Sequence, residues 1–428
     1  MLRILCSIYW LFQTGYSSAA IAQVNEDYQL QVSYSYGSSQ LLPSLITNSN
    51  IAFDGSNQFS DIWFRGGFKI SEQLSYMGAL EITDQPHELI LTKYSRPDYP
   101  LSTGRIQQSV VSYTTNKLEV KIGRDDMLSN DLRPGIFTYP LFADGMSWNY
   151  SWHNWSFKHV FQILPGESHL NQNFRRSVSY HHLSRSFNNL TIGAGEYFIL
   201  TSENIGFDLK RYNPFLPYFV NSFDSEADIY PGFSGDSDNG LIKLFLDWRN
   251  QSSKVSINLY IDEFQIDAAD REVVSDAILL SFSAEHEIKA FGQRNLLNWG
   301  ISAANPNFGQ HPGPFTTTTI GMYPLLEYTP GMKNLVYFES RTLLNETWEI
   351  LIAGHSERWV NISQLAPSLM NRRDELKALS GNSDSRLALG LGYKLKNYPV
   401  DLRIEGWSGS DSGVRIKIQF ASNRGAKQ

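Results

Sequence analysis

Apolar and polar residues alternate with a period of two along much of this 428-residue chain. In residues 118–123, for example, Leu, Val and Ile alternate with Glu, Lys and Gly. The same pattern recurs in residues 155–163, 242–248, 255–262, 387–395 and 414–420. Because successive side chains of a β-strand point to opposite faces, each of these segments predicts a strand with one apolar and one polar face.

Two kinds of protein contain such strands, a barrel that spans a membrane and a soluble β-sandwich or propeller. Segments of about ten residues match a tilted crossing of the hydrocarbon layer. Several apolar faces also end in tryptophan, as the aromatic girdle at a membrane interface does; these residues are Trp148, Trp152, Trp155 and Trp248. We therefore expect an all-β fold, a closed antiparallel transmembrane β-barrel, in preference to a sandwich or propeller.

The connections between the predicted strands fall into two lengths. The short ones mostly contain Asn, which tolerates the positive φ of tight hairpin turns; they are 115–116, 153–154, 188–189, 250–251, 345–346 and 397–398. The long ones are 126–145, 165–174, 202–238, 267–275, 304–316 and 357–384, and residues 365–380 have a helical composition. Short turns at one end and long extracellular loops at the other predict a barrel of about 18 strands, although the up-and-down order is interrupted between Ala290 and Asn334.

The beginning of the chain reads as a secretory signal. Met1-Leu2-Arg3 is a short basic start, residues 4–16 are mostly apolar, and Ala20-Ile21-Ala22 fits a cleavage site. We predict a signal peptide over 1–22 and a single barrel domain over 23–428; the apolar core is short for the alternative, a membrane anchor. Since Cys6 is the only cysteine, the mature chain cannot be stapled by disulfides.

The net charge and the predicted export indicate which binding partners to expect. The net charge of −7 argues against binding nucleic acid. Export of a chain with the composition of a barrel predicts the cell outer membrane as its location, with outer-membrane lipid and the barrel-insertion machinery as partners. The last strong strand ends on Phe420, and a terminal aromatic residue suits recognition by that machinery.

The densest polar stretch lies between two alternating strands, in residues 123–152. It contains charged and amide side chains that we expect at the functional interior or mouth of the barrel: Arg124, Asp125, Asp126, Asn130 and Arg133. Asp125-Asp126 could also serve as an acid/base pair, but adjacent carboxylates in a polar loop are more often solvated or paired with an arginine.

A second candidate is the long loop over residues 201–239. Tyr212-Asn213 opens a run in which aromatic residues are interleaved with acids, and Asp238-Asn239 closes it. Aromatic rings stack on the C–H face of a sugar, and carboxylate or amide groups bind its hydroxyls, so this composition suits a carbohydrate. Its carboxylates could also bind Ca²⁺, although their spacing does not match an EF-hand; a loop that simply packs over the barrel is the plainer alternative.

No catalytic motif for hydrolysis or phosphate binding is present. His181-His182 lies within an alternating segment, where adjacent side chains point to opposite faces and make a poor metal pair. We therefore expect no enzyme activity, no cofactor and no metal. The alternation places charges of both signs inside the barrel, which disfavours a simple open pore: Lys121, Lys158, Lys243, Asp247, Asp262, Arg403, Glu405, Arg415 and Lys417.

Several motifs occur in a fixed order. They are Leu128-Ser129-Asn130 with Arg133-Pro134, the strand pair over 146–164, residues 179–184, residues 212–215, Asp238-Asn239 before 259–265, and residues 327–329. Together they resemble the Wzi-type capsule assembly family. The resemblance covers about Gly123 to Phe420 and implies an outer-membrane barrel that holds surface polysaccharide in a lectin-like way. The chain departs from the family pattern in lacking a Trp/Gly/Pro-rich segment before Leu128 and a helical bundle near the N-terminus.

The function expected from these observations is binding or organisation of exported surface polysaccharide, capsular or exopolysaccharide. Its predicted site consists of the following residues: Arg124, Asp125, Asp126, Asn130, Arg133, Tyr212, Asn213, Asp238 and Asn239. The main alternative is a porin-like diffusion channel for small solutes. An outer-membrane enzyme and a purely structural barrel are further alternatives.

Overall fold

The computed structural model describes most of the strands and their short turns. The described residues are 27–37, 58–83, 103–127, 142–163, 167–169, 172–202, 238–263, 277–290, 292–305, 308, 319–320, 323–324, 332–359, 382–395, 400–409 and 413–423. Among these residues there is no helix both long and apolar enough to cross a membrane. The predicted signal peptide and the helical composition over 365–380 lie outside the described residues.

The described elements are strands, most of them nine to sixteen residues long. In chain order they are β1 (Asp27–Gly37), β2 (Gln58–Lys69), β3 (Leu74–Thr83), β4 (Thr103–Thr114), β5 (Leu118–Asp126), β6 (Phe142–Trp152), β7 (Trp155–Ile163), β8 (Glu167–His169), β9 (Gln172–Phe187), β10 (Leu190–Ser202), β11 (Asp238–Arg249), β12 (Ser253–Glu263), β13 (Ala277–Ala290), β14 (Gln293–Ala304), β15 (Thr319–Ile320), β16 (Tyr323–Pro324), β17 (Met332–Leu343), β18 (Trp348–Trp359), β19 (Asn382–Lys394), β20 (Val400–Gly409) and β21 (Gly413–Asn423). The lengths of the long strands match an oblique membrane crossing.

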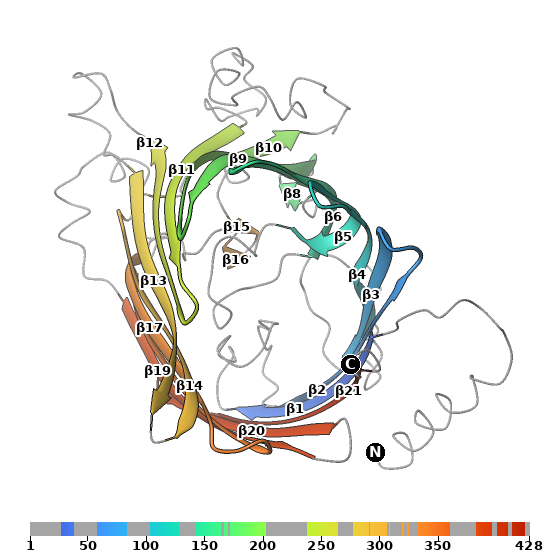
Figure 1. The fold of residues 1–428 in the computed structure, drawn as a ribbon, viewed down its shortest axis with the longest axis vertical. Helices are drawn as coiled ribbons and strands as arrows, with labels where there is room; N and C mark the ends of the chain where they lie inside the picture. The colour runs from blue at the N-terminus through green and yellow to red at the C-terminus, as the bar shows by residue number, and fades with distance from the viewer. Residues whose placement is uncertain are drawn as a thin grey trace, which may run out of the picture.

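Strands that follow one another in the chain pair antiparallel, and Figure 1 shows them curving into a ring. The sequence order is interrupted twice: β7 pairs with β9 because the short β8 extends only the start of β9, and β14 pairs with β17 because β15 and β16 form a separate ribbon. β1 pairs with β2 along one edge and with β21 along the other, so the first and last strands lie side by side. The prediction of an all-β antiparallel sheet is confirmed.

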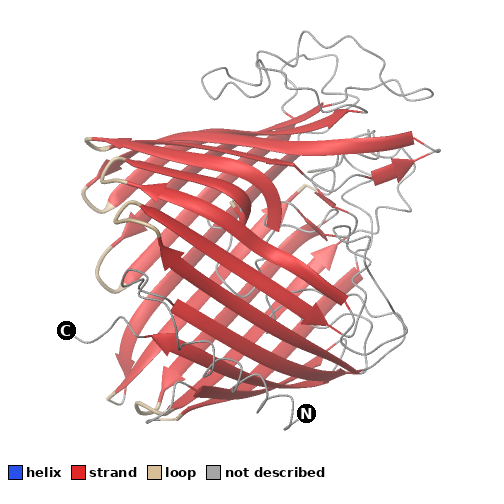
Figure 2. Cartoon of the chain, turned by 90° about the vertical axis from the view of Figure 1, so that its right-hand side faces the viewer, coloured by secondary structure: helices blue, strands red, loops and turns tan. Residues whose placement is uncertain are grey.

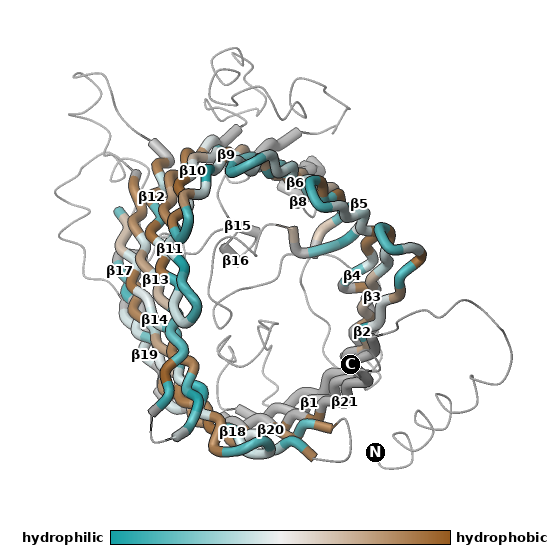
Figure 3. The backbone as a smooth tube through the Cα atoms, in the orientation of Figure 1, coloured by the Kyte–Doolittle hydropathy of each residue, from teal (hydrophilic) through white to brown (hydrophobic). Residues whose placement is uncertain are grey.

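Hydrophobic and hydrophilic residues alternate along the strands, as Figure 3 shows, so the two faces of the curved sheet differ in polarity. Large apolar side chains are exposed on the convex, outer face; Ile122 is 60 % exposed and Leu389 is 57 % exposed. The residues between them face inward and are mostly polar or small. Exposed apolar surface on this scale is unfavourable in water and is what lipid would cover.

The described hairpin turns gather at one end of the sheet (Figure 2). Five of the six predicted short turns lie between consecutive strands as expected, and the sixth, 397–398, is outside the described residues. His153 and Asn188 adopt positive φ of 53° and 51°, as tight turns require. The pattern did not reveal two further turns, at 70–73 and around Gly292.

Three predicted loops are shorter than the pattern suggested; in 357–384, β18 continues to Trp359 and β19 begins at Asn382. The expected loop 126–145 is strand at its end, because β6 already begins at Phe142. The expected loop 165–174 contains β8 and the start of β9, which pair with each other as a small hairpin. Between Ala290 and Asn334, where the predicted order was interrupted, the described residues form β14, the small β15–β16 ribbon and the start of β17.

An aromatic cluster lies on the outer face at the turn end, where the girdle was predicted. Tyr150 and Trp152 stack with ring centroids 5.7 Å apart, and Trp152 stacks on Trp155 at 6.4 Å. Trp348 of β18 and Tyr393 of β19 also meet on the outer face at the turn end, as a tilted pair with ring centroids 4.6 Å apart. Tryptophan and tyrosine at this level are typical of a membrane interface.

Candidate functional site

The predicted site residues Arg124, Asp125 and Asp126 are the last residues of β5 and not part of a loop. The three alternate along the strand, so Arg124 lies on the face of Ile122, which is the outer face, whereas Asp125 lies on the inner face. Arg124 and Asp125 therefore do not combine into one site, although they are adjacent in sequence.

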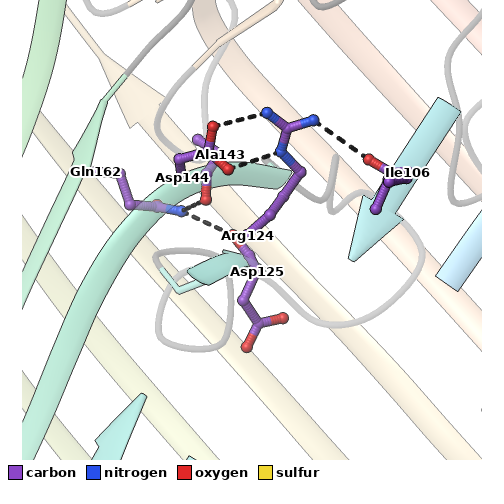
Figure 4. Close-up of polar contacts among 6 residues, drawn as sticks. All are labelled: Ile106, Arg124, Asp125, Ala143, Asp144 and Gln162. Atoms are coloured by element: carbon purple, nitrogen blue, oxygen red, sulfur yellow. Dashed lines mark hydrogen bonds and ion pairs between the residues drawn. The ribbon is translucent and has the colours of Figure 1, made fainter. Parts of the chain in front are cut away.

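Arg124 forms a bidentate ion pair on the outer side of the sheet (Figure 4). Its Nε donates to Asp144 Oδ1 at 2.9 Å and its Nη2 donates to Asp144 Oδ2 at 2.7 Å. Its Nη1 also donates to the carbonyl of Ile106 at 3.4 Å. The guanidinium thus joins β4, β5 and β6, and its hydrogen-bonding capacity is largely used within the wall.

Asp125 is 7 % exposed and is held from two sides on the inner face. Gln108 donates its Nε2 hydrogen to Asp125 Oδ1 at 2.6 Å. Gln162 donates to the Asp125 carbonyl at 2.7 Å and to the Ala143 carbonyl at 3.3 Å. Because these buried amides bind one carboxylate oxygen and the adjacent backbone, this cluster fixes the geometry of the β5–β6 hairpin at the end where the chain passes from β5 to β6.

Gly123, just before this pair, cannot be replaced without strain. Its φ is +126°, and an added Cβ would lie 2.2 Å from the carbonyl oxygen of Ser109 on β4. The left-handed conformation and the close approach of β4 both require a residue without a side chain.

Of the other predicted site residues, the structure describes only Asp238 and Asn239. Asp238 and Asn239 are the first residues of β11, where their backbones pair with Leu200 and Ile199 of β10. Asn130, Arg133, Tyr212 and Asn213 lie outside the described residues, as do Asp224 to Asp236 of the possible Ca²⁺ set.

The inner face of β9 to β12 contains a cluster that the sequence did not reveal. We call it the aromatic tier, and it consists of Tyr180, His182, Tyr197, Lys243, Phe245 and Tyr260. Tyr180 stacks on Tyr197 with ring centroids 4.0 Å apart, and its hydroxyl lies 2.6 Å from Nδ1 of His182. The His182 ring meets the edge of Phe245 at 5.4 Å.

Lys243 is the charged member of the aromatic tier and is only 2 % exposed. Its Nζ lies 5.2 Å from the ring centroid of Phe245 and 5.5 Å from that of Tyr260. Aromatic faces attract a cation, and the attraction is stronger where water is excluded. The ammonium group is therefore stabilised in part by the two rings that flank it.

Two glycines of β10 provide the space for these rings. A Cβ on Gly193 would lie 2.2 Å from Cζ of Phe245, and one on Gly195 would lie 2.7 Å from the His181 carbonyl oxygen. Gly193 therefore lets the Phe245 ring lie directly over the backbone of the neighbouring strand. Gly195 permits close approach of β9 itself.

A polar groove lies between the aromatic tier and the hairpin turns, at the turn end of β9 to β12. We call it the turn-end groove; its volume is about 920 Å³, and it is lined by Asn188, Asn189, Thr191, Asp247, Arg249, Asn250, Gln251, Ser252 and Lys254. Asp247 follows Phe245 by two positions and thus shares its face of β11. The groove, at Asp247, therefore adjoins the aromatic tier, at Phe245, along β11.

The inner face of β17 to β20 is different, because ion pairs dominate it. We call this part the charged wall, made of Glu339, Arg341, Glu349 and Arg403. Glu339 is 5 % exposed and is paired with Arg341, while Arg403 Nη2 lies 3.3 Å from Glu349 Oε1. The latter pair crosses β19 at Gly392, whose missing side chain leaves a path for the arginine.

The expectations for charges, histidines and metals can be compared with these positions. Lys121, Lys243 and Arg403 lie on the inner face, as the alternation predicted. His182 joins the aromatic tier, whereas His181 faces outward with its Nε2 3.5 Å from Glu196 Oε2. The described residues contain no group of three or more His, Cys, Asp or Glu side chains that could hold a metal ion.

Sequence reasoning missed the aromatic tier because its members come from separate strands. Tyr180 and Tyr197 meet only through the register of β9 with β10, and Lys243 and Tyr260 meet through that of β11 with β12. The available signal was the combination of inward aromatic positions with the pair Gly193 and Gly195.

Neither a protein-family model nor a curated protein sequence matches this chain. Among solved structures, the fold is similar to Wzi of Escherichia coli, described as an outer-membrane protein involved in group 1 capsule assembly and a carbohydrate-binding β-barrel. The similarity covers 92 % of this chain and 84 % of that one, with a TM-score of 0.53 and 10 % sequence identity. This likeness shows that the chain has the fold of an outer-membrane β-barrel.

Two structures from Pseudomonas aeruginosa are also similar in outline. OccK5 (OpdH) matches with a TM-score of 0.49 and 8 % identity over 94 % of this chain and 99 % of that one. OccD3 (OpdP) matches with a TM-score of 0.47 and 10 % identity over 92 % and 91 % of the two chains.

Proposed function

We propose that this chain is a closed, non-enzymatic outer-membrane barrel of about 18 strands that binds or organises exported surface polysaccharide. Its apolar outer face would contact lipid, and the barrel-insertion machinery would place it in the membrane after export. The Escherichia coli barrel of similar fold is described as carbohydrate-binding, which supports this proposal.

The turn-end groove is the observation that carries the proposal. Because short turns mark the periplasmic end of an outer-membrane barrel, the groove would bind the exported polysaccharide at that end of the lumen. Its lining combines amides, hydroxyls, one carboxylate and two cations, which together offer donors and acceptors to a polyhydroxylated ligand. Phe245 lies two positions along β11 from Asp247 of the groove, and its ring contacts that of His182, so the two rings would add aromatic surface. Its volume falls in the range of ordinary ligand sites, and its open shape suits a segment of a long polymer better than an enclosed small molecule.

The first experiment measures cell-bound and released polysaccharide in a strain that lacks this protein. We expect the total amount of polymer to stay the same and the released fraction to rise. An unchanged ratio would overturn the retention function.

Complementation then locates the site. We expect Asp247→Ala, Arg249→Ala and Phe245→Ala each to raise the released fraction, with the protein still present in the outer membrane. Arg124→Ala is the matched control, because Arg124 lies on the outer face and is engaged by Asp144. If Arg124→Ala, Asn130→Ala and Tyr212→Ala release polymer while the groove variants do not, the site lies at the segments predicted from sequence and not in the groove.

A porin-like diffusion channel is the second candidate, favoured by the many polar side chains of the inner face. Conductance in planar bilayers separates the two functions. A silent or briefly opening protein agrees with a polysaccharide-binding barrel, whereas a large and steady conductance supports a channel.

A further inference from the structure

The outer face of β9 to β12 carries an apolar groove with a cation at its edge. The volume of this outer groove is about 700 Å³. It is lined by the outward-facing residues Trp155, Leu183, Arg185, Phe187, Ile192, Ala194, Leu244, Leu246, Ile257 and Leu259, together with Gly193 and Phe245, which alternate with them along β10 and β11 and whose side-chain positions face inward. Ala194 is the small residue among the larger ones on this face, so the surface is hollowed at its position. Leu183, Ile192 and Leu244 around it are 42 %, 46 % and 43 % exposed.

Arg185 marks the turn end of the outer groove, two residues before β9 ends at Phe187. Its Cζ lies 5.2 Å from the Trp155 ring centroid and 4.8 Å from the Phe187 ring centroid. Trp155 belongs to the aromatic cluster that includes Trp152. The guanidinium is therefore held at the level where an aromatic girdle meets the lipid headgroups.

The charge of Arg185 has no counterpart in the part of the chain that the structure describes. Its side chain is exposed, and no ion pair joins it to a described carboxylate. Arg124, the other arginine discussed on the outer face, is fully engaged by Asp144. The two rings approach Arg185 through cation–π contact, which leaves its N–H groups available for an anion.

We propose that this outer groove binds one phospholipid of the periplasmic leaflet, with its phosphate on Arg185 and an acyl chain along Ile192, Ala194 and Leu244. A guanidinium binds phosphate through paired hydrogen bonds, and the apolar lining matches a hydrocarbon chain and not a hydrated ligand. The inference rests on the membrane placement proposed above and does not depend on polysaccharide binding.

The test uses the mature chain reconstituted in vesicles of phosphatidylethanolamine and phosphatidylglycerol, then extracted with mild detergent and weighed by native mass spectrometry. We expect the wild type to retain one phospholipid. Arg185→Gln should lower the lipid-bound fraction about tenfold, because charge-assisted hydrogen bonds to phosphate are lost. Arg185→Lys should restore part of it, and Arg249→Gln, which changes an inner-face arginine, should not alter it.

Ala194→Phe tests the acyl part of the site while leaving Arg185 intact, since the new ring would fill the hollow. We expect it to remove the retained lipid. The slower mobility of heated samples on gels shows in each case that the barrel has folded. Equal lipid retention in the wild type, Arg185→Gln and Ala194→Phe would overturn the proposal, as would a dimer or trimer mass that Ala194→Phe converts to monomer, because a second copy would then occupy the groove.

Flotation of the wild type with the same vesicles separates the two levels of inference. A protein that floats but retains no phospholipid contradicts the lipid site alone. A protein that does not associate with vesicles contradicts the membrane placement, and with it both proposals.

Discussion

The aromatic tier and the charged wall lie on the same inner face but are stabilised in different ways. In the aromatic tier a buried ammonium lies between rings, and the neighbouring Tyr180 and Tyr197 are stacked. In the charged wall the buried carboxylate of Glu339 depends on a guanidinium. Removing one group from packed rings lowers the stability only moderately, whereas leaving a buried charge without its partner is strongly destabilising. The comparison predicts that the two regions respond differently to single substitutions.

The largest effect is expected when the charged wall loses a guanidinium. Arg341→Ala leaves Glu339 buried without its main partner, and we expect the free energy of unfolding to fall by about 3 kcal/mol. Urea-dependent unfolding in detergent micelles, followed by tryptophan fluorescence, measures this change. The double variant Arg341→Leu/Glu339→Leu should recover most of the loss, since it removes both charges; no recovery would show that the loss comes from packing.

The next effect concerns the close approach of strands in the aromatic tier. Gly195→Ala introduces a Cβ against the His181 carbonyl, and we expect a loss of about 2 kcal/mol from overpacking. Gly193→Ala is the comparison, because the atoms nearest its new Cβ belong to side chains, the movable tip of the Phe245 ring and Cβ of Ser184 at 2.9 Å, and not to a backbone carbonyl. The same unfolding measurement should show a smaller loss for Gly193→Ala. Equal losses would mean that ring position, and not backbone approach, limits this region.

A smaller effect is expected for the hydroxyl of the aromatic tier. Tyr180→Phe keeps the stacking on Tyr197 and removes the hydrogen bond to His182, so we expect a loss of about 1 kcal/mol. Tyr197→Phe at the other ring of the stack serves as the comparison. A loss above that for Arg341→Ala would reverse the ranking of the two regions.

The smallest effect should come from an exposed pair on the inner face. Lys254 and Glu285 lie 3.4 Å apart, with side chains 38 % and 42 % exposed. Exposed ion pairs contribute little, so Lys254→Ala should change stability by less than about 0.5 kcal/mol. A thermal unfolding midpoint close to that of the wild type would confirm that burial, and not pairing, distinguishes the charged wall.

The alternation of residue types was sufficient to assign the faces of the strands. It placed Leu389 outside and Lys243 inside, and the Asn-containing turns were located where hairpins form. It was not sufficient for contacts between strands, because these depend on register, which involves residues far apart in sequence. Lys243 and Tyr260 illustrate this: each has an unremarkable inward position, and only the pairing of β11 with β12 brings them together.

The predicted site shows the same limit. Polar composition drew attention to Arg124 and Asp125 but could not show that β5 continues through both and sends them to opposite faces. The sequence shows a glycine at position 123 but not why it is needed. It is needed because β4 approaches its backbone closely, and no local sequence pattern gives that distance. The roles predicted for Asn130, Arg133, Tyr212 and Asn213 remain predictions.

The pairing of β1 with β21 has a consequence for how the protein is made. The other described long strands pair with the long strand before or after them in the chain, across connections that range from two-residue turns to long loops such as 203–237. Each of these connections is far shorter than the whole chain, so closing it costs less entropy. The β1–β21 pairing alone joins residues near the two ends, such as Leu30 and Phe420. During synthesis the first edge of β1 therefore stays without its hydrogen-bonding partner until the last strand emerges, and a truncated chain would present two unpaired edges to other proteins.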